Sequence, residues 1–117
     1  MKFKIIYNAR FMFWARGMVL WPFLLLKPYK RKPETSLFNK KWNEQALADE
    51  DRIYRHELQH CYQVKQEGRL KFYGKYLWYQ VRHGYTDNPY EVDARAHENE
   101  PLTPTETSWR RRGKVVL

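Results

Sequence analysis

The 117-residue sequence lacks the features that stabilise many small domains. Cys61 is its only cysteine, which excludes an internal disulfide and a cysteine-rich zinc site. With four histidines in the chain, a metal site has to be built from histidine and carboxylate side chains. No second domain is expected at this length, and 43% apolar residues suffice for one modest core.

Long hydrophobic runs are also missing. The most apolar segment, residues 11–26, is interrupted by Arg16, Gly17 and Pro22 and falls short of the roughly 20 residues that a membrane span needs. No small-residue cleavage motif follows it. We therefore expect core structure here, with neither a transmembrane helix nor a signal peptide.

Acidic residues are scarce outside the middle of the chain, and the net charge is +9. Lys27 to Lys41 carries six basic side chains and one acidic side chain, whereas residues 42–109 carry eight basic and twelve acidic ones. Four more basic side chains lie in the last eight residues. We expect any contact with an acidic protein or a nucleic acid to use Lys27 to Lys41 and Arg110 to Lys114, the alternative for the second segment being a solvated tail.

Hydrophobic periodicity predicts an α+β fold in one domain, residues 1–100, followed by a basic C-terminal tail, residues 101–117. Residues 3–7 alternate like an edge strand, and residues 18–26 form a continuous apolar run compatible with a buried strand. A loop is expected over residues 27–48, with a helical turn over residues 42–47 as the alternative. Helices are predicted over three ranges, which are residues 49–67, 70–82 and 90–99.

The strongest functional signal is the sequence His-Glu-Leu-Gln-His at residues 56–60. On a helix, His56 and His60 lie one turn apart on the same face, so both imidazoles can reach one ion. Glu57 then projects beside a water molecule that this ion would bind. The alternative is an exposed histidine pair that flanks an ordinary glutamate.

A catalytic zinc site usually has three protein ligands, so a third ligand has to come from elsewhere in the chain. Glu91 is favoured, because it lies on the first turn of the third predicted helix and Ala94, one turn later, would let two helices approach closely. The alternatives are His97, Glu98 and Asp93. His97 is predicted to lie on the side of its helix opposite to Glu91.

The segments HELQHCYQ and FYGKYLWYQVRHGYTDNPYEVDARA resemble the small gluzincin-type zinc metallopeptidase domains encoded by bacteriophages and bacteria. Those domains pair HExxHxxQ with a downstream NPxExxA helix, and the resemblance covers about residues 18–98. It implies a minimal zincin-like fold, in which a few N-terminal strands pack on the HExxH helix and two further helices. It also implies that His56, His60 and Glu91 bind Zn²⁺, and that Glu57 is the general base for a zinc-activated water that hydrolyses a peptide or protein substrate.

Other roles stay open at this point. Arg95 stands where larger gluzincins have an acid, so the carboxylate that would orient a ligand histidine is unassigned, with Asp93 as a weak substitute. Gln63 is expected either to contact substrate or to bond to a neighbouring loop. The turn that leads to Glu91 contains three candidates for stabilising an oxyanion, which are Tyr85, His83 and Arg82. The alternatives are a core position for Tyr85 and a surface position for His83.

Three functions follow as hypotheses. The favoured one is a zinc-dependent peptidase. The second is a catalytically weak or inactive zincin-fold protein with a structural or interaction role, for example a bacteriophage virion component. The third is a nucleic-acid-binding module. We expect the protein to be cytoplasmic or associated with a virion.

Overall fold

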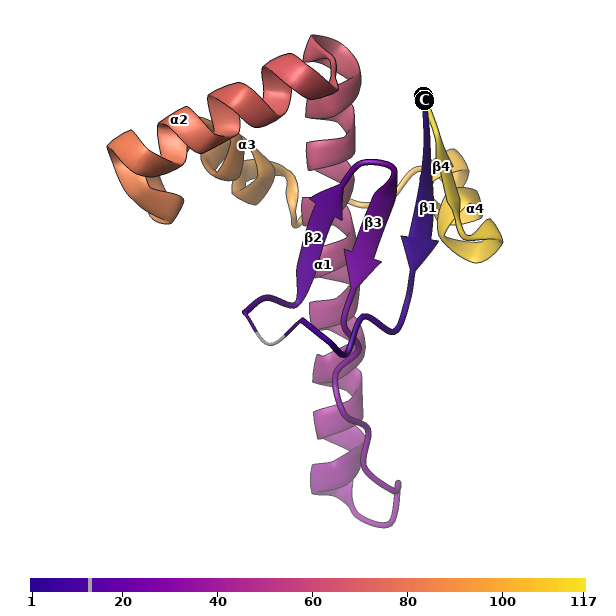
Figure 1. The fold of residues 1–117 in the computed structure, drawn as a ribbon. Helices are drawn as coiled ribbons and strands as arrows, with labels where there is room; N and C mark the ends of the chain where they lie inside the picture. Colours follow the sequence, from indigo (N-terminus) through magenta and orange to yellow (C-terminus); the bar gives the residue numbers. More distant parts are fainter. Residues whose placement is uncertain (13) are drawn as a thin grey trace.

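The computed structural model describes residues 1–12 and 14–117 and confirms the α+β fold (Figure 1). In chain order its elements are β1 (Lys2–Ile6), β2 (Gly17–Leu20), β3 (Phe23–Leu26), α1 (Leu37–Glu67), α2 (Arg69–Asp87), α3 (Pro89–His97), α4 (Pro104–Arg112) and β4 (Lys114–Val116). None of the helices in these described ranges is long and apolar enough to cross a membrane.

The strands form one sheet in the order β2-β3-β1-β4, with β1 parallel to β3 and antiparallel to β4. The prediction of an edge strand over residues 3–7 is therefore wrong, because β1 has neighbours on both sides. The apolar run of residues 18–26 is not one strand but the antiparallel hairpin of β2 and β3. Its turn lies at Trp21 and Pro22, where proline has no N–H to donate to a strand.

The core lies between the sheet and the C-terminal half of α1, which runs behind the strands (Figure 1). From the sheet, Phe3, Leu24 and Val115 are fully buried against it. From α1, Tyr54, Leu58, Cys61 and Val64 fill the other side of the same cluster, at helical spacing. This packing places residues 56–60 of α1 within the domain.

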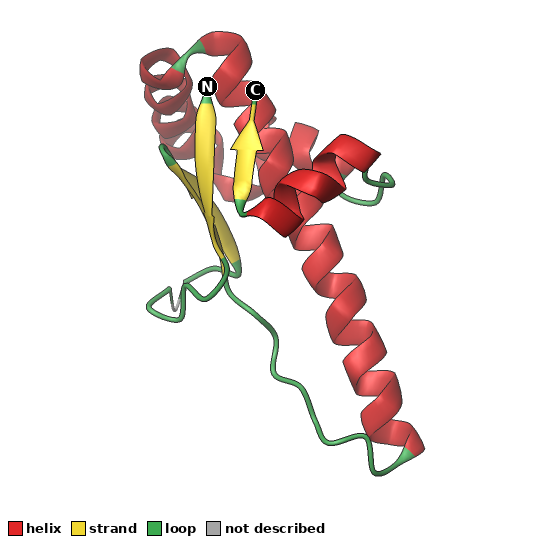
Figure 2. Ribbon diagram, turned by 90° about the vertical axis from the view of Figure 1, so that its right-hand side faces the viewer, coloured by secondary structure: helices red, strands yellow, loops and turns green. Residues whose placement is uncertain are grey.

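Helix α1 begins twelve residues before the predicted start, so the expected loop over residues 27–48 is wrong in its second half. Ser36 caps the helix by accepting a hydrogen bond from the backbone N–H of Asn39. The N-terminal half of α1 projects from the body of the protein, and the chain before it runs back along the helix (Figure 2). The Asn43 side chain holds this preceding segment against α1, because its amide accepts from the backbone N–H of Lys32 and donates to the carbonyl of Lys32.

The second and third predicted helices are confirmed as α2 and α3. Gly68 ends α1 with φ 84°, a conformation that favours glycine, and α2 starts directly after it. Asn88 caps α3 by accepting from the N–H of Tyr90, and Pro89 occupies the first turn. These two junctions fix where the site residues of α1 and α3 face each other.

The expected tail at residues 101–117 is instead folded. Thr103 and Glu106 form a reciprocal capping box at the start of α4, and Gly113 ends that helix in the left-handed conformation. β4 then pairs with β1 along the sheet. Arg110 forms an ion pair with Asp51 of α1, so this basic segment is not simply a solvated tail.

We predict that β4 contributes measurably to stability through Val115. Val115→Ala removes two buried carbons and leaves a small cavity, so the free energy of unfolding should fall by about 2 kcal/mol. Val116→Ala, at the half-exposed next position, should change it by less than about 0.5 kcal/mol. Urea unfolding followed by circular dichroism measures both, and equal values for the two variants would contradict the packing of β4.

Candidate metal centre

Helix α1 carries His56, Glu57 and His60 into the interior, where all three side chains are buried. The two imidazole rings have their centroids 5.1 Å apart, as expected for positions one helical turn apart. Ligand atoms of the three residues lie within 4.8 Å of one another. The sequence motif therefore forms a compact group of three side chains that can bind a metal.

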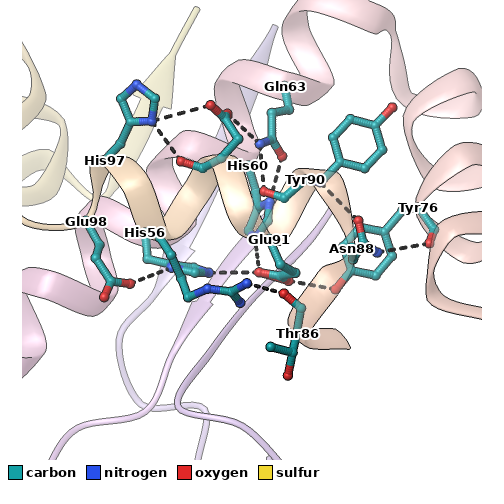
Figure 3. Close-up of polar contacts among 12 residues, drawn as sticks. His56, His60, Gln63, Tyr76, Thr86, Asn88, Tyr90, Glu91, His97 and Glu98 are labelled. Atoms are coloured by element: carbon teal, nitrogen blue, oxygen red, sulfur yellow. Dashed lines mark hydrogen bonds and ion pairs between the residues drawn. The ribbon is translucent and has the colours of Figure 1, made fainter. Parts of the chain in front are cut away.

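Glu91 of α3 completes this group. Its Oε1 atom lies 2.9 Å from Nε2 of His56 and 2.9 Å from Nε2 of His60 (Figure 3). The structure thus brings together the two histidines and the favoured third residue, and it does so through one carboxylate oxygen. Ala94, one turn later on α3, is fully buried where the helix meets α1.

The other nitrogen of each imidazole has its own partner. Nδ1 of His56 lies 2.8 Å from Oε2 of Glu98, and Nδ1 of His60 lies 2.7 Å from Oε1 of Gln63. The Gln63 amide is oriented, because its Nε2 donates to the carbonyl of Tyr90 and to Asp93. Both Nδ1 atoms therefore face acceptors and act as the donors.

This arrangement determines what the centre can bind. With their protons on Nδ1, His56 and His60 each direct the lone pair of Nε2 toward Oε1 of Glu91. Three electron-pair donors that converge at such short distances repel one another unless a cation, either a proton or a metal ion, lies among them. Two imidazole nitrogens and one carboxylate are also a donor set that catalytic zinc commonly uses, so the residues present fit zinc.

The pKa values of His60 and Glu91 reflect the attraction of both groups for a shared proton. Burial disfavours the charged form of His60, but hydrogen bonding to Glu91 and the nearby Glu57 charge raise its pKa to about 9. Burial alone would raise the pKa of Glu91, yet hydrogen bonds from both imidazoles hold it well below its usual range. Without a metal, the centre thus keeps its carboxylate charged and attracts protons to its histidines.

Tyr76 of α2 supports the remaining oxygen of Glu91. Its hydroxyl donates to Oε2 at 2.7 Å, while Oε1 faces the two histidines (Figure 3). The ring of Tyr76 also lies beside that of His60, with centroids 6.2 Å apart. Tyr76 therefore ties α2 to the centre and fixes the rotation of the Glu91 carboxylate.

Glu57 faces a pocket of about 750 Å³ that opens beside the two histidines. Within the described ranges its carboxylate forms no hydrogen bond, and burial raises its pKa, although both imidazoles partly offset this effect. Strand β2 passes close by: a Cβ atom added to Gly17 would lie 2.7 Å from Cγ of Glu57. Gly17 therefore allows the strand to cover Glu57 while its carboxylate stays available.

The alternatives for the third ligand lie elsewhere. Nδ1 of His97 bonds to the backbone carbonyl of Asp93 at 2.8 Å, on the far side of α3 from Glu91 (Figure 3). Asp93 accepts from Gln59 and Gln63, so it acts on His60 only through Gln63. Glu98 contacts Nδ1 of His56 and not the side where the ligand atoms converge.

The sequence prediction missed the roles of two residues, of which Glu98 was named only as an alternative third ligand. The position of Glu98, at the C-terminal end of α3, supplies the unassigned carboxylate that orients a histidine; its spacing of seven residues from Glu91 is a helical signal that could have indicated this. No role was predicted for Tyr76, which lies within the second predicted helix. Its role depends on how α2 packs against α3, which no local pattern shows.

Of the three candidates for stabilising an oxyanion, Tyr85 alone lines the pocket. Its side chain is half-exposed, so the alternative of a core position is wrong. His83 is exposed, in agreement with its surface alternative, and Arg82 is exposed on α2. Arg95 also lines the pocket and donates to the backbone carbonyl of Thr86 (Figure 3).

Comparison with known proteins adds no relative, since no family model, curated protein or solved structure matches the chain.

The close approach at Gly17 gives a testable prediction. Gly17→Ala should lower the free energy of unfolding by about 1–3 kcal/mol, because its methyl group would meet Glu57 and Ile53 at 2.7 and 2.9 Å. Gly74→Ala is the matched control: it lies in α2 with open space around it and should stabilise by about 0.4–1 kcal/mol. Thermal unfolding of both variants tests this, and a neutral Gly17→Ala would contradict the close contact.

Proposed function

We propose that the chain is a zinc-dependent peptidase-like protein in which His56, His60 and Glu91 hold the metal ion and Glu57 is the general base. The observation that carries the proposal is the convergence of two imidazole Nε2 atoms on one carboxylate oxygen. A buried glutamate without hydrogen-bond partners in the described ranges lies directly beside this convergence, on the wall of a pocket.

A bound zinc ion would polarise a peptide carbonyl and make a water molecule more acidic. Glu57 would take a proton from the attacking water and deliver it to the leaving amine. Its raised pKa suits both steps, because a base with a very low pKa accepts protons poorly. Because the carboxylate forms no hydrogen bond to residues 1–12 or 14–117, both of its oxygens are available for this transfer.

Tyr85 is the residue that we propose for binding the developing oxyanion. Burial, followed by the charges of Glu91 and Glu57, raises the pKa of its phenol to about 12. The hydroxyl therefore keeps its proton at neutral pH and can donate a hydrogen bond. Tyr85 lies at the pocket that also contains Glu57.

The pocket favours a peptide or protein substrate that brings an apolar side chain to the centre. Its walls include Leu20 of β2, Ile53 of α1 and Tyr73 of α2, so most of the contact surface is apolar. His56, Glu57, His60 and Glu91 line the same pocket and would meet the peptide bond, while Arg16, Arg52, Gln80 and Arg95 add further polar groups to its wall. Such a combination is common in pockets that position one bond for reaction.

A second candidate function is a zinc-stabilised structural or interaction protein. An ion held by His56, His60 and Glu91 would connect α1 to α3 whether or not hydrolysis occurs. In this alternative the segment Lys27 to Lys41 would contact an acidic protein or a nucleic acid; its first part runs along the projecting half of α1, and residues 37–41 begin that helix (Figure 2). The two candidates share the metal centre and differ in the role of Glu57.

We predict that the purified protein contains about one zinc ion per chain. His60→Ala should abolish this content, because two remaining ligands hold zinc poorly. His97→Ala is the control and should leave it unchanged, since His97 bonds to the backbone of Asp93 instead. Elemental analysis after dialysis measures the content, and full zinc occupancy in His60→Ala would exclude the proposed ligand set.

The role of Glu57 gives a separate prediction. Glu57→Gln keeps the size of the side chain but removes the base, so peptide hydrolysis should fall by roughly 10²- to 10⁴-fold while zinc content and melting temperature stay near wild type. Cleavage of unfolded casein and of a mixed peptide library, with and without a zinc chelator, provides the assay. Glu44→Gln, exposed on the projecting half of α1, is the matched control and should retain full activity.

The same assay separates the two candidates. Cleavage that persists with chelator, or equal rates for wild type and Glu57→Gln, would count against catalysis at this centre. If wild type cleaves nothing while chelation lowers the melting temperature by many degrees, zinc has the structural role.

A further inference from the structure

The outward face of α2 carries a row of apolar residues that the rest of the described chain leaves uncovered. We name Leu70, Gly74, Leu77, Trp78 and Val81 the α2 stripe. The four larger side chains are 85% (Leu70), 66% (Leu77), 60% (Trp78) and 78% (Val81) exposed. Successive members are three or four residues apart, apart from the adjacent Leu77 and Trp78, so they share one side of the helix.

This exposure is not a by-product of a loosely packed helix. The opposite side of α2 is well packed: Phe72 is buried, and its ring contacts those of Tyr76 and Tyr90. Helix α2 is therefore apolar on two sides, whereas a surface helix normally presents polar residues to solvent. A row of this kind commonly indicates an interaction surface.

The shape of the surface narrows the choice of partner. None of the four large side chains of the α2 stripe lines either pocket described for this chain. All four side chains are more than half exposed, and α2 itself lies along the upper edge of the molecule (Figure 1). A helical peptide usually binds in a preformed groove, whereas a fluid lipid surface accommodates protruding side chains without one.

The charged residues beside the α2 stripe restrict the choice of partner further. The exposed Lys71 and Arg82 lie seven residues before and four residues after Trp78, so both flank the stripe on the same side. Neither forms an ion pair within the described ranges, and no acidic residue occurs between Arg69 and Thr86. An apolar row with tryptophan and flanking basic residues is complementary to an anionic bilayer interface.

A second copy of the chain is a less suitable partner for the α2 stripe than a lipid surface. Two copies that paired through the α2 stripe would bring together two molecules of net charge +9, with Lys71 and Arg82 at the contact. Five residues per side also fall short of the roughly 20–30 of a stable protein interface.

We propose that α2 docks the protein peripherally on an anionic phospholipid surface, with the α2 stripe inserted among the lipid headgroups and Lys71 and Arg82 beside the lipid phosphates. The side chains would enter only the interfacial region, so the proposal requires no membrane-spanning helix. It is independent of zinc and of peptide hydrolysis.

Co-sedimentation of the full chain with vesicles tests the proposal. Wild type should bind vesicles of equal parts phosphatidylglycerol and phosphatidylcholine, and bind pure phosphatidylcholine at least tenfold more weakly. Leu77→Ser/Val81→Ser keeps the charge but should lower binding to the anionic vesicles at least tenfold. Leu37→Ser/Leu47→Ser, two exposed leucines on α1, is the matched control and should change it less than about twofold.

A second pair of variants tests whether Lys71 and Arg82 contribute to vesicle binding. Lys71→Gln/Arg82→Gln should weaken binding at least tenfold, whereas Lys40→Gln/Lys41→Gln, on the projecting half of α1, should weaken it less than about threefold. Charges more than a Debye length of roughly 8 Å from the lipid surface are largely screened. Equal losses for the two variants would show general attraction of a basic protein and would overturn the proposal.

Tryptophan emission supplies a second measurement on folded protein. Wild-type emission should shift to shorter wavelength on anionic vesicles, and Trp78→Phe should lose most of this shift. Absence of vesicle binding by wild type would overturn the proposal. A concentration-dependent dimer that Leu77→Ser/Val81→Ser abolishes would also overturn it and assign the α2 stripe to a second copy.

Discussion

The shared contact of two imidazoles with one oxygen of Glu91 is the constraint on which most of the structure depends. A charged carboxylate buried in so small a domain is costly unless every lone pair has a partner. Here Tyr76 donates to Oε2, while His56 and His60 face Oε1 and are compatible with its charge only when a proton or a metal ion lies among them. These contacts hold α1, α2 and α3 at fixed distances, so the candidate site and the packing of the three helices depend on each other.

The part of the site that follows from local spacing could be predicted from sequence. His56 and His60 share a face because of helical geometry, and Asn88 with Pro89 is a strong signal for a helix start just before Glu91. Glu98 and Tyr76 could not be assigned in the same way. Their contacts depend on the packing of α3 and α2 against α1, and a single sequence contains no direct record of that packing.

The fold was predictable to a similar extent. Asp49, Glu50 and Asp51 look like the start of a helix, but acidic residues are equally compatible with its interior, and Ser36 provides the actual cap. Thr103, Pro104, Glu106 and Gly113 are local signals that would have located α4. By contrast, β4 forms only because it pairs with β1 at the other end of the chain, which makes β1 an inner strand.

Helix α2 joins the two proposed activities of the molecule in one element. Tyr76 contacts Glu91 on its inner side, while the adjacent Leu77 belongs to the exposed α2 stripe. Since a helix with its side chains is roughly 10–12 Å across, a surface bound by the α2 stripe would lie about one helix diameter from the candidate metal centre. Docking through α2 would therefore hold the pocket close to the bilayer in a restricted orientation, and peptide segments near that surface would reach Glu57 more readily than freely diffusing ones.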